Sequence, residues 1–198
     1  MKTKRLLFFY LSIMFALILC GLIFPEEFTA LLKHPEFYIH AKFIHILCVT
    51  LFFANAVIGM IWETRSLLSN DLNAVRYTYQ TVVWLDAIFT APLIIISVMT
   101  GIMMGTILGG IWSIGWLSIA FTLFLLSGLV WVLADIPTQY QVKREFKSIP
   151  DDVREIPDRL RRLLWRRAGI SFLGTAPLLV IFYLMVHKPA LPKVSELF

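Results

Sequence analysis

Two apolar stretches decide the fold: KFIHILCVTLFFANAVIGMIW at residues 42–62 and VVWLDAIFTAPLIIISVMTGIMMGTIL at residues 82–108. Each is long enough to cross about 30 Å of hydrocarbon as a helix, which takes roughly 20 apolar residues. Both also carry polar side chains at the depth of the bilayer, namely His45, Asn55, Asp86, Ser97 and Thr100. Because charged and imidazole groups are costly in lipid, such residues usually face other helices or a binding site. We therefore expect this helical hairpin to be the functional core.

The composition places the rest of the chain in the bilayer as well. Of the 198 residues, 59% are hydrophobic, and the mean hydropathy is +0.78, whereas soluble domains are about 45–50% apolar. Five runs reach spanning length, at about 6–24, 43–62, 82–108, 111–134 and 168–186. The sequence therefore predicts an all-α fold, a single transmembrane domain over 1–198 built as a bundle of five transmembrane helices.

The distribution of Lys and Arg predicts the orientation of these spans. With five spans, one side of the membrane receives the N-terminus, the 63–80 loop and the 135–167 loop, and it holds 14 of the 18 basic residues. The other side holds the remaining four: Lys33, Lys42, Lys188 and Lys193. We expect the N-terminus inside and the C-terminus outside, in a bacterial inner membrane. The net charge of +5 is then explained by topology and anionic lipid, and nucleic acid is not expected as a partner.

Two connecting segments are expected to form short interfacial helices. Residues 25–35 begin Pro-Glu-Glu, with a proline and two acids suited to the first turn of a helix. Asp135-Ile136-Pro137 is expected to end the fourth span. The following segment, 136–167, is predicted to be a cytoplasmic basic amphipathic loop, with two short helices lying on anionic headgroups. The first span, which follows three basic residues, is expected to be an uncleaved helix because no small-residue cleavage site follows it.

The predicted topology gathers ligand-type side chains at the outer side. All four histidines fall there, together with several Cys and Met residues. Imidazole, thiolate and thioether suit copper, and imidazole suits haem iron. His45 lies about one turn inside the second span and is the candidate cofactor or metal ligand; a hydrogen bond to a neighbouring helix is the structural alternative. Lys42 lies one turn earlier on the same face, where it could hold a haem propionate or extend to the surface.

Asp86 begins the third span near the opposite, cytoplasmic edge. Antiparallel pairing places it near residue 57, within reach of Asn55. The functional interpretation is a proton or cation relay. The structural alternative is a bond to Asn55, or a salt bridge to Arg65 or Arg76.

Three stretches of the chain carry a family resemblance: Lys42-Phe43-Ile44-His45, the span from Trp116-Leu117 to Ile136-Pro137, and the ending Tyr183-Leu184-Met185-Val186-His187-Lys188-Pro189. They resemble a bacterial family of predicted integral membrane proteins of unknown function. The Lys-x-x-His opening is also similar to the HemJ-type protoporphyrinogen oxidases, in which such a histidine is tied to haem b, and to the CopD-type copper-resistance domain. The resemblance implies that His45 and Lys42 hold haem b or copper. The Trp-Phe-x-Gly motif of the oxidases is replaced by Phe52-Phe53-Ala54-Asn55, so oxidase activity is not implied.

Three functions follow as hypotheses. The first is a membrane protein with a haem-b or metal site at His45, serving electron transfer or haem and copper handling. The second is an accessory subunit of a larger membrane complex or a homo-oligomer, without a cofactor of its own. The third is a small proton-coupled transporter using Asp86 and Asn55. The sequence contains no Walker loop, G-x-S-x-G, H-E-x-x-H or C-x-x-C motif, so it offers no catalytic residues for a hydrolase or a nucleotide-dependent enzyme.

Overall fold

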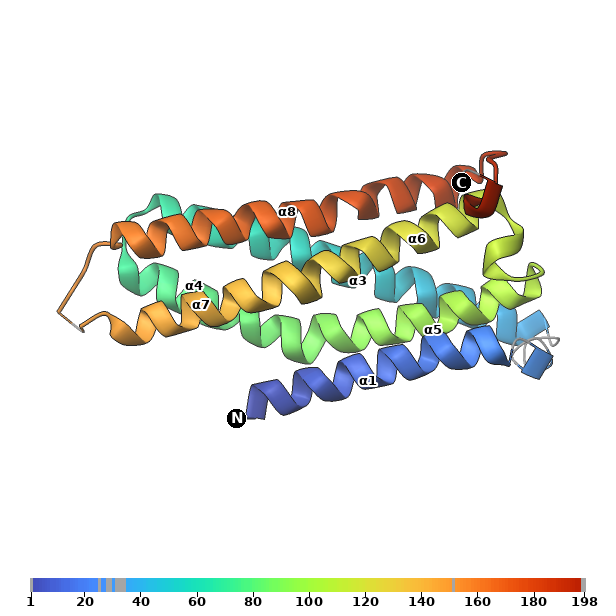
Figure 1. Ribbon diagram of the computed structural model, residues 1–198, viewed down its shortest axis with the longest axis horizontal. Coiled ribbons are helices and arrows are strands. Elements are labelled where there is room, and N and C mark those ends of the chain that lie inside the picture. Colours follow the sequence, from blue (N-terminus) through green and yellow to red (C-terminus); the bar gives the residue numbers. More distant parts are fainter. Residues whose placement is uncertain (1, 25, 28–29, 31–34, 151, 197–198) are drawn as a thin grey trace.

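The computed structural model describes residues 2–24, 26–27, 30, 35–150 and 152–196, and these form an elongated helical bundle (Figure 1). The helices run along its long axis (Figure 1). All the elements of the described residues are helical, so the predicted all-α class is confirmed. The long elements are α1 (Lys2–Ile23), α3 (Pro35–Leu68), α4 (Leu72–Leu85), α5 (Ala91–Ile107), α6 (Gly115–Val130), α7 (Ile136–Ser148) and α8 (Asp158–His187). The short turns are η1 (Asp86–Thr90), η2 (Ile111–Ser113), η3 (Trp131–Asp135) and η4 (Val194–Glu196).

Four helical runs are long and apolar enough to cross a membrane. They are Glu36–Leu68, Leu72–Ile107, Gly115–Ser148 and Asp158–His187. Their outer faces carry exposed apolar side chains, such as Phe172 and Leu173 on α8, that suit contact with lipid tails. A helical membrane bundle is therefore the architecture of this chain. A shorter apolar stretch, Phe8–Gly21, lies within α1.

The packing pairs helices that are distant in sequence. α3 lies along α5, α6 lies along α8, and α3 also contacts α8. α1 lies against α5, and Figure 1 shows that it stops short of the end at which α7 gives way to α8. We call that end, with the 69–71 turn and the 149–157 loop, the basic end. The opposite end, where α3 begins and α8 finishes, is called the histidine end.

The turns after α3 and after α5 are explained by the residues that form them. Asn70 adopts a left-handed conformation (φ 56°) between α3 and α4, and Asp71 caps α4 by accepting a 2.8 Å hydrogen bond from the backbone N–H of Asn73. Gly109 and Gly110 form the turn after α5 with φ values of 92° and 108°, which glycine adopts without strain.

Two π-helical turns interrupt the long helices, and each precedes a proline. In η1 the N–H of Ala91 bonds to the carbonyl of Asp86, one residue before Pro92. In η3 the N–H of Ile136 bonds to the carbonyl of Trp131, one residue before Pro137. Proline has no backbone N–H to donate, and the wider π-helical turn accommodates this missing hydrogen bond. The regular α-helical hydrogen bonds then continue after the proline. The expectation that the helix stops at 135–137 was therefore wrong, because α7 continues it to Ser148; where the fourth span leaves the membrane stays a prediction.

The segment 136–167 also differs from the predicted surface loop. α7 and the first turns of α8 extend the bundle lengthwise, and they pack with α4 and the end of α3 into a helical cap. The cap has its own apolar core: Leu67, Leu72, Val75, Tyr79, Val142, Ile156, Leu160 and Leu164. An antiparallel bridge between Asp71 and Glu155 ties the 149–157 loop to the start of α4. The apolar stripe of this segment therefore faces other helices, where we had expected it to face headgroups. The interfacial helix predicted at 25–35 falls mostly on residues outside the described ones.

Candidate functional site

A cavity of about 470 Å³ opens among α3, α5, α6 and α8 at the histidine end. His45 and Lys42 both line it, as do Met104, Met185 and Lys188. Most of the remaining lining is apolar or aromatic, contributed by side chains such as Phe52, Val98, Phe121 and Phe182. Its volume and composition are those of a pocket for a small organic ligand, which typically has apolar walls and few polar groups.

The ring of His45 is fixed from α5. Its Nδ1 lies 2.8 Å from the backbone carbonyl oxygen of Ser97 and 3.2 Å from the hydroxyl of Thr100. Because a carbonyl only accepts hydrogen bonds, Nδ1 carries the proton, and Nε2 keeps its lone pair. Gly101 provides the space for the ring, since a Cβ there would lie 3.0 Å from His45 Cε1. The structural alternative, a hydrogen bond to a neighbouring helix, is present, and it also orients His45 as a ligand.

Two lysines lie on the wall of this cavity. Lys42 is one turn from His45 on α3, and Lys188 follows α8 with its Nζ 5.8 Å from the ring centre of Trp116. Of the other histidines, His40 and His187 are exposed, and His34 lies outside the described residues. Within the described residues, no group of three or more His, Cys, Asp or Glu is placed to hold a metal ion.

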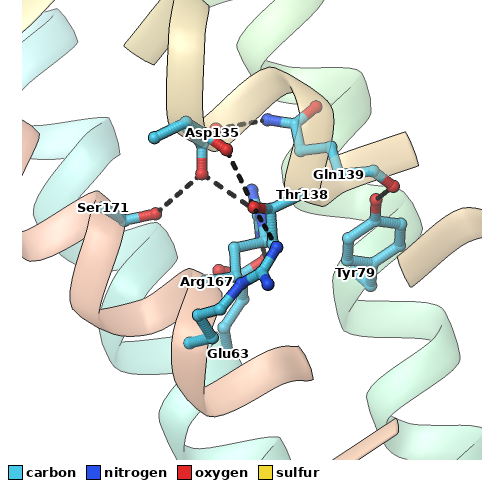
Figure 2. A network of polar contacts seen from close by, with 9 residues as sticks. Glu63, Tyr79, Asp135, Thr138, Gln139, Arg167 and Ser171 are labelled. Atoms are coloured by element: carbon cyan, nitrogen blue, oxygen red, sulfur yellow. Dashed lines mark hydrogen bonds and ion pairs between the residues drawn. The ribbon is translucent and has the colours of Figure 1, made fainter. Parts of the chain in front are cut away.

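A second polar site lies toward the basic end, where four helical runs bring charged residues together (Figure 2). Arg167 of α8 is ion-paired with Glu63 of α3, and its Nε lies 3.5 Å from Oδ1 of Asp135 in η3. Arg167 and Asp135 are only 3% and 4% exposed. The guanidinium also lies over the ring of Tyr79, 5.2 Å from its centre. We call Glu63, Asp86, Asp135 and Arg167 the charged cluster.

Neutral groups surround the Asp135 carboxylate. Gln139 donates a 2.7 Å hydrogen bond to its Oδ2, and Ser171 donates one of 3.2 Å to its Oδ1. The hydroxyl of Tyr79 in turn donates to the backbone carbonyl of Gln139 at 2.7 Å. Figure 2 shows Gln139 and Ser171 reaching the Asp135 carboxylate from opposite sides, with Tyr79 beyond Gln139. Asp135 is thus held by donors from two helices besides its ion pair.

Asp86 of η1 and Asn55 of α3 both contact Thr90, which lies one helical turn after Asp86. The amide of Asn55 donates a 2.7 Å hydrogen bond to the Thr90 hydroxyl, and the Asp86 carboxylate contacts the same residue. Asp86 lies in electrostatic range of Arg167, Glu63 and Asp135. The predicted hydrogen bond between Asp86 and Asn55 is therefore not formed, and both residues contact Thr90 instead. The cation near Asp86 is Arg167, whereas the sequence had suggested Arg65 or Arg76. The transport role assigned to Asp86 stays a prediction.

Sequence reasoning missed Glu63, Asp135 and Arg167. Each lies at the end of an apolar run, where hydropathy cannot separate a buried charge from a surface one. One signal was available: each charged-cluster residue has a tryptophan within four positions, at Trp62, Trp84, Trp131 and Trp165.

Together, the long apolar helices and the polar groups enclosed among them define a polytopic helical membrane protein. The chain belongs to the family described as predicted integral membrane protein (DUF2269), which matches residues 39–189. The predicted family of membrane proteins of unknown function is thereby confirmed. The match covers the hairpin, both polar sites and Lys188, and it begins after α1. No curated protein and no solved structure matches the chain.

Proposed function

We propose that the cavity at the histidine end binds a planar, largely apolar cofactor with anionic groups, and that haem b is this cofactor. The observation that carries the proposal is the hydrogen bond from His45 Nδ1 to the Ser97 carbonyl, because it turns Nε2 into a free and oriented ligand. Bound haem would supply reversible one-electron chemistry at its iron. The protein would then serve electron transfer or haem handling in the membrane.

The residues present fit such a group. His45 would hold the iron through a neutral imidazole, and the thioethers of Met104 and Met185, which are also side chains that bind haem iron, line the same cavity. Phe52, Phe121 and Phe182 offer aromatic surface to a flat ring system. Gly101 and Gly105 leave one wall without bulk, since a Cβ at either would come within about 3 Å of a neighbouring side chain.

Lys42 and Lys188 supply the charge that carboxylate substituents of a cofactor require. Both line the cavity, and both are exposed enough for their ammonium groups to reach the membrane surface. An ammonium paired with a carboxylate gives specificity for an anionic ligand over a neutral lipid. Copper is the other cofactor that the donors accept, because imidazole and thioether suit copper(I).

The placement in the membrane is part of the same proposal. α1 supplies the fifth span, the basic end faces the cytoplasm, and the histidine end faces the outside of a bacterial inner membrane. The 14-to-4 distribution of basic residues supports this orientation. Exposed cations on the cap, among them Arg162 and Arg166, support contact with anionic headgroups. The accessory-subunit hypothesis stays a prediction.

The test is an absorption spectrum of the protein purified in mild detergent, together with iron and copper analysis. We expect a Soret band, with iron at about one atom per chain, and loss of both in His45→Ala. His187→Ala is the matched control, because His187 is exposed at the same end, stacked on Tyr183. It should keep the band.

The outcomes separate the candidates. Copper without a Soret band, lost in His45→Ala, would replace haem with a copper ion at the same ligand. A colourless and metal-free wild-type protein that also fails to take up added haem would overturn the proposal. Equal haem content in wild type and His45→Ala would show that the histidine is not the ligand.

A further inference from the structure

The charged cluster contains more acid than base. Glu63, Asp86 and Asp135 contribute three carboxyl groups, and Arg167 contributes one guanidinium. The ionisable groups in electrostatic range of Asp86 and Tyr79 are these four residues, with Tyr79 the fifth. If all three carboxyl groups were ionised, the cluster would carry two uncompensated negative charges. Unpaired charge in a protein interior is costly and is usually removed by protonation.

The three carboxyl groups are not equivalent. Glu63 has the ion pair with Arg167, and Asp135 has two neutral donors plus the more distant Arg167 Nε. Asp86 has the hydroxyl of Thr90, which can also accept a hydrogen bond from a protonated acid. The carboxyl group with the least compensation is therefore that of Asp86.

An independent observation concerns Arg167. Its Nε–H is buried and has no hydrogen-bond acceptor, although Asp135 Oδ1 lies 3.5 Å away. Buried donors are nearly always satisfied, and the acceptor nearest to this one is the Asp135 carboxylate. A small rotation of the guanidinium would strengthen its contact with Asp135 when Glu63 becomes protonated. The cluster can thus accommodate a proton at more than one carboxyl group.

The position of the cluster suits proton exchange. Each of the four residues lies within four positions of a tryptophan, and tryptophan is enriched where transmembrane helices meet the membrane surface. Asp86 and Asp135 both belong to π-helical turns, which are frequent at functional sites and give the backbone room to adjust.

We propose that the charged cluster is a buried proton-binding site, in which Asp86 holds a proton at neutral pH and Glu63 and Asp135 share Arg167. The proton is exchanged with water, and no other reactant is required. This site lies at the opposite end of the bundle from the His45 cavity. It does not depend on what that cavity binds.

The test is infrared spectroscopy of the protein in phospholipid vesicles, which detects the C=O stretch of a neutral carboxylic acid. At about pH 7 the wild type should show this band, and it should shift in protein labelled with ¹³C-aspartate. Asp86→Asn should remove most of it, whereas Asp152→Asn, a change of an exposed carboxylate in the 149–157 loop, should leave it unchanged. Arg167→Gln should enlarge the band about twofold, because the cluster then lacks its cation.

The proposal is overturned if the wild type shows no neutral carboxyl band at this pH. It is also overturned if Asp86→Asn leaves the band intact, whatever the bands of Glu63→Gln and Asp135→Asn. If the variants do not fold, the wild-type protein alone tests the proposal. A neutral carboxyl band that shifts with ¹³C-aspartate supports it, since only an aspartate in this cluster should be both buried and neutral, and a band that does not shift overturns it.

Discussion

At the scale of single residues, the smallest side chains at the histidine end control the shape of the cavity. Gly101→Ala should lower cofactor content several-fold, because the new methyl group would lie 3.0 Å from His45 Cε1 and turn the ring. Gly128→Ala is the control, as nothing lies within 4 Å of a Cβ at that position. Cofactor per chain by absorbance, with melting temperature beside it, distinguishes a displaced ring from an unfolded bundle. Equal loading of the two variants would contradict the assigned role of Gly101.

Substituting Arg167 measures how much the buried ion pairs of the charged cluster contribute to the stability of the protein. Arg167→Gln should destabilise the protein by about 3–5 kcal/mol, because removing one partner of a buried ion pair leaves the other uncompensated. Arg159→Gln should change the free energy of unfolding by about 1 kcal/mol or less, since Arg159 pairs with Glu145 while its side chain is 76% exposed. Denaturant unfolding in detergent provides the comparison.

A double variant shows whether the loss at Arg167 comes from the stranded acid. Glu63→Gln combined with Arg167→Gln should be less destabilised than the sum of the single changes, by about 1 kcal/mol or more. Simple additivity would mean that the Glu63–Arg167 pair contributes little.

Sequence reasoning at this scale found the residues that are exceptional in their surroundings. His45, Asn55 and Asp86 interrupt apolar runs, and the structure places all three between helices. Arg167 could not be found in the same way, because it follows Arg161, Arg162 and Arg166 in the chain. Its burial depends on the angle at which α8 faces Glu63 and Asp135, which is a property of the assembled bundle.

At the scale of elements, the helix starts in the cap depend on local capping. Asp71→Ala should destabilise the start of α4 by about 1 kcal/mol, because the backbone N–H groups of Asn73 and Ala74 lose their acceptor. Hydrogen exchange should accelerate over residues 72–76, and Asp152→Ala should leave those rates unchanged. Unchanged exchange in Asp71→Ala would show that the Asp71–Glu155 bridge alone holds this turn.

The elements also show what hydropathy can and cannot predict. Four of the five predicted apolar runs lie in helices long and apolar enough to span a membrane, as expected where every residue must be apolar or enclosed. The continuation of the helix past residue 135 was not predicted, because Asp135-Ile136-Pro137 has the residues of a helix stop. A π-helical turn lets the helix pass that proline, and it is stabilised by contacts that Asp135 makes with α8.

At the scale of the whole molecule, apolar side chains have two kinds of surroundings. Those of the cap core are buried, whereas many along the spans lie on the outside of the bundle. Leu160→Ala should therefore cost about 2–5 kcal/mol, as for other fully buried leucines. Leu173→Ala, at a position 64% exposed on the same helix, should cost far less. Thermal unfolding in detergent distinguishes them, and equal losses would mean that the cap is not a packed core.

The orientation of the molecule can be tested from its two ends. In a chain carrying Cys20→Ser and Cys48→Ala, a single Asp152→Cys or Ala190→Cys change places one thiol in the cap loop or after α8, where both positions are exposed. Loops rich in Arg and Lys near span ends usually stay in the cytoplasm, and the cap carries most of the Arg and Lys residues of this chain, so we expect the cap to be cytoplasmic. A membrane-impermeant maleimide should thus label position 190 in intact cells and position 152 only after permeabilisation. The reverse pattern would place the cap outside, and the proton-binding site would then face the outer water while the His45 cavity faced the cytoplasm.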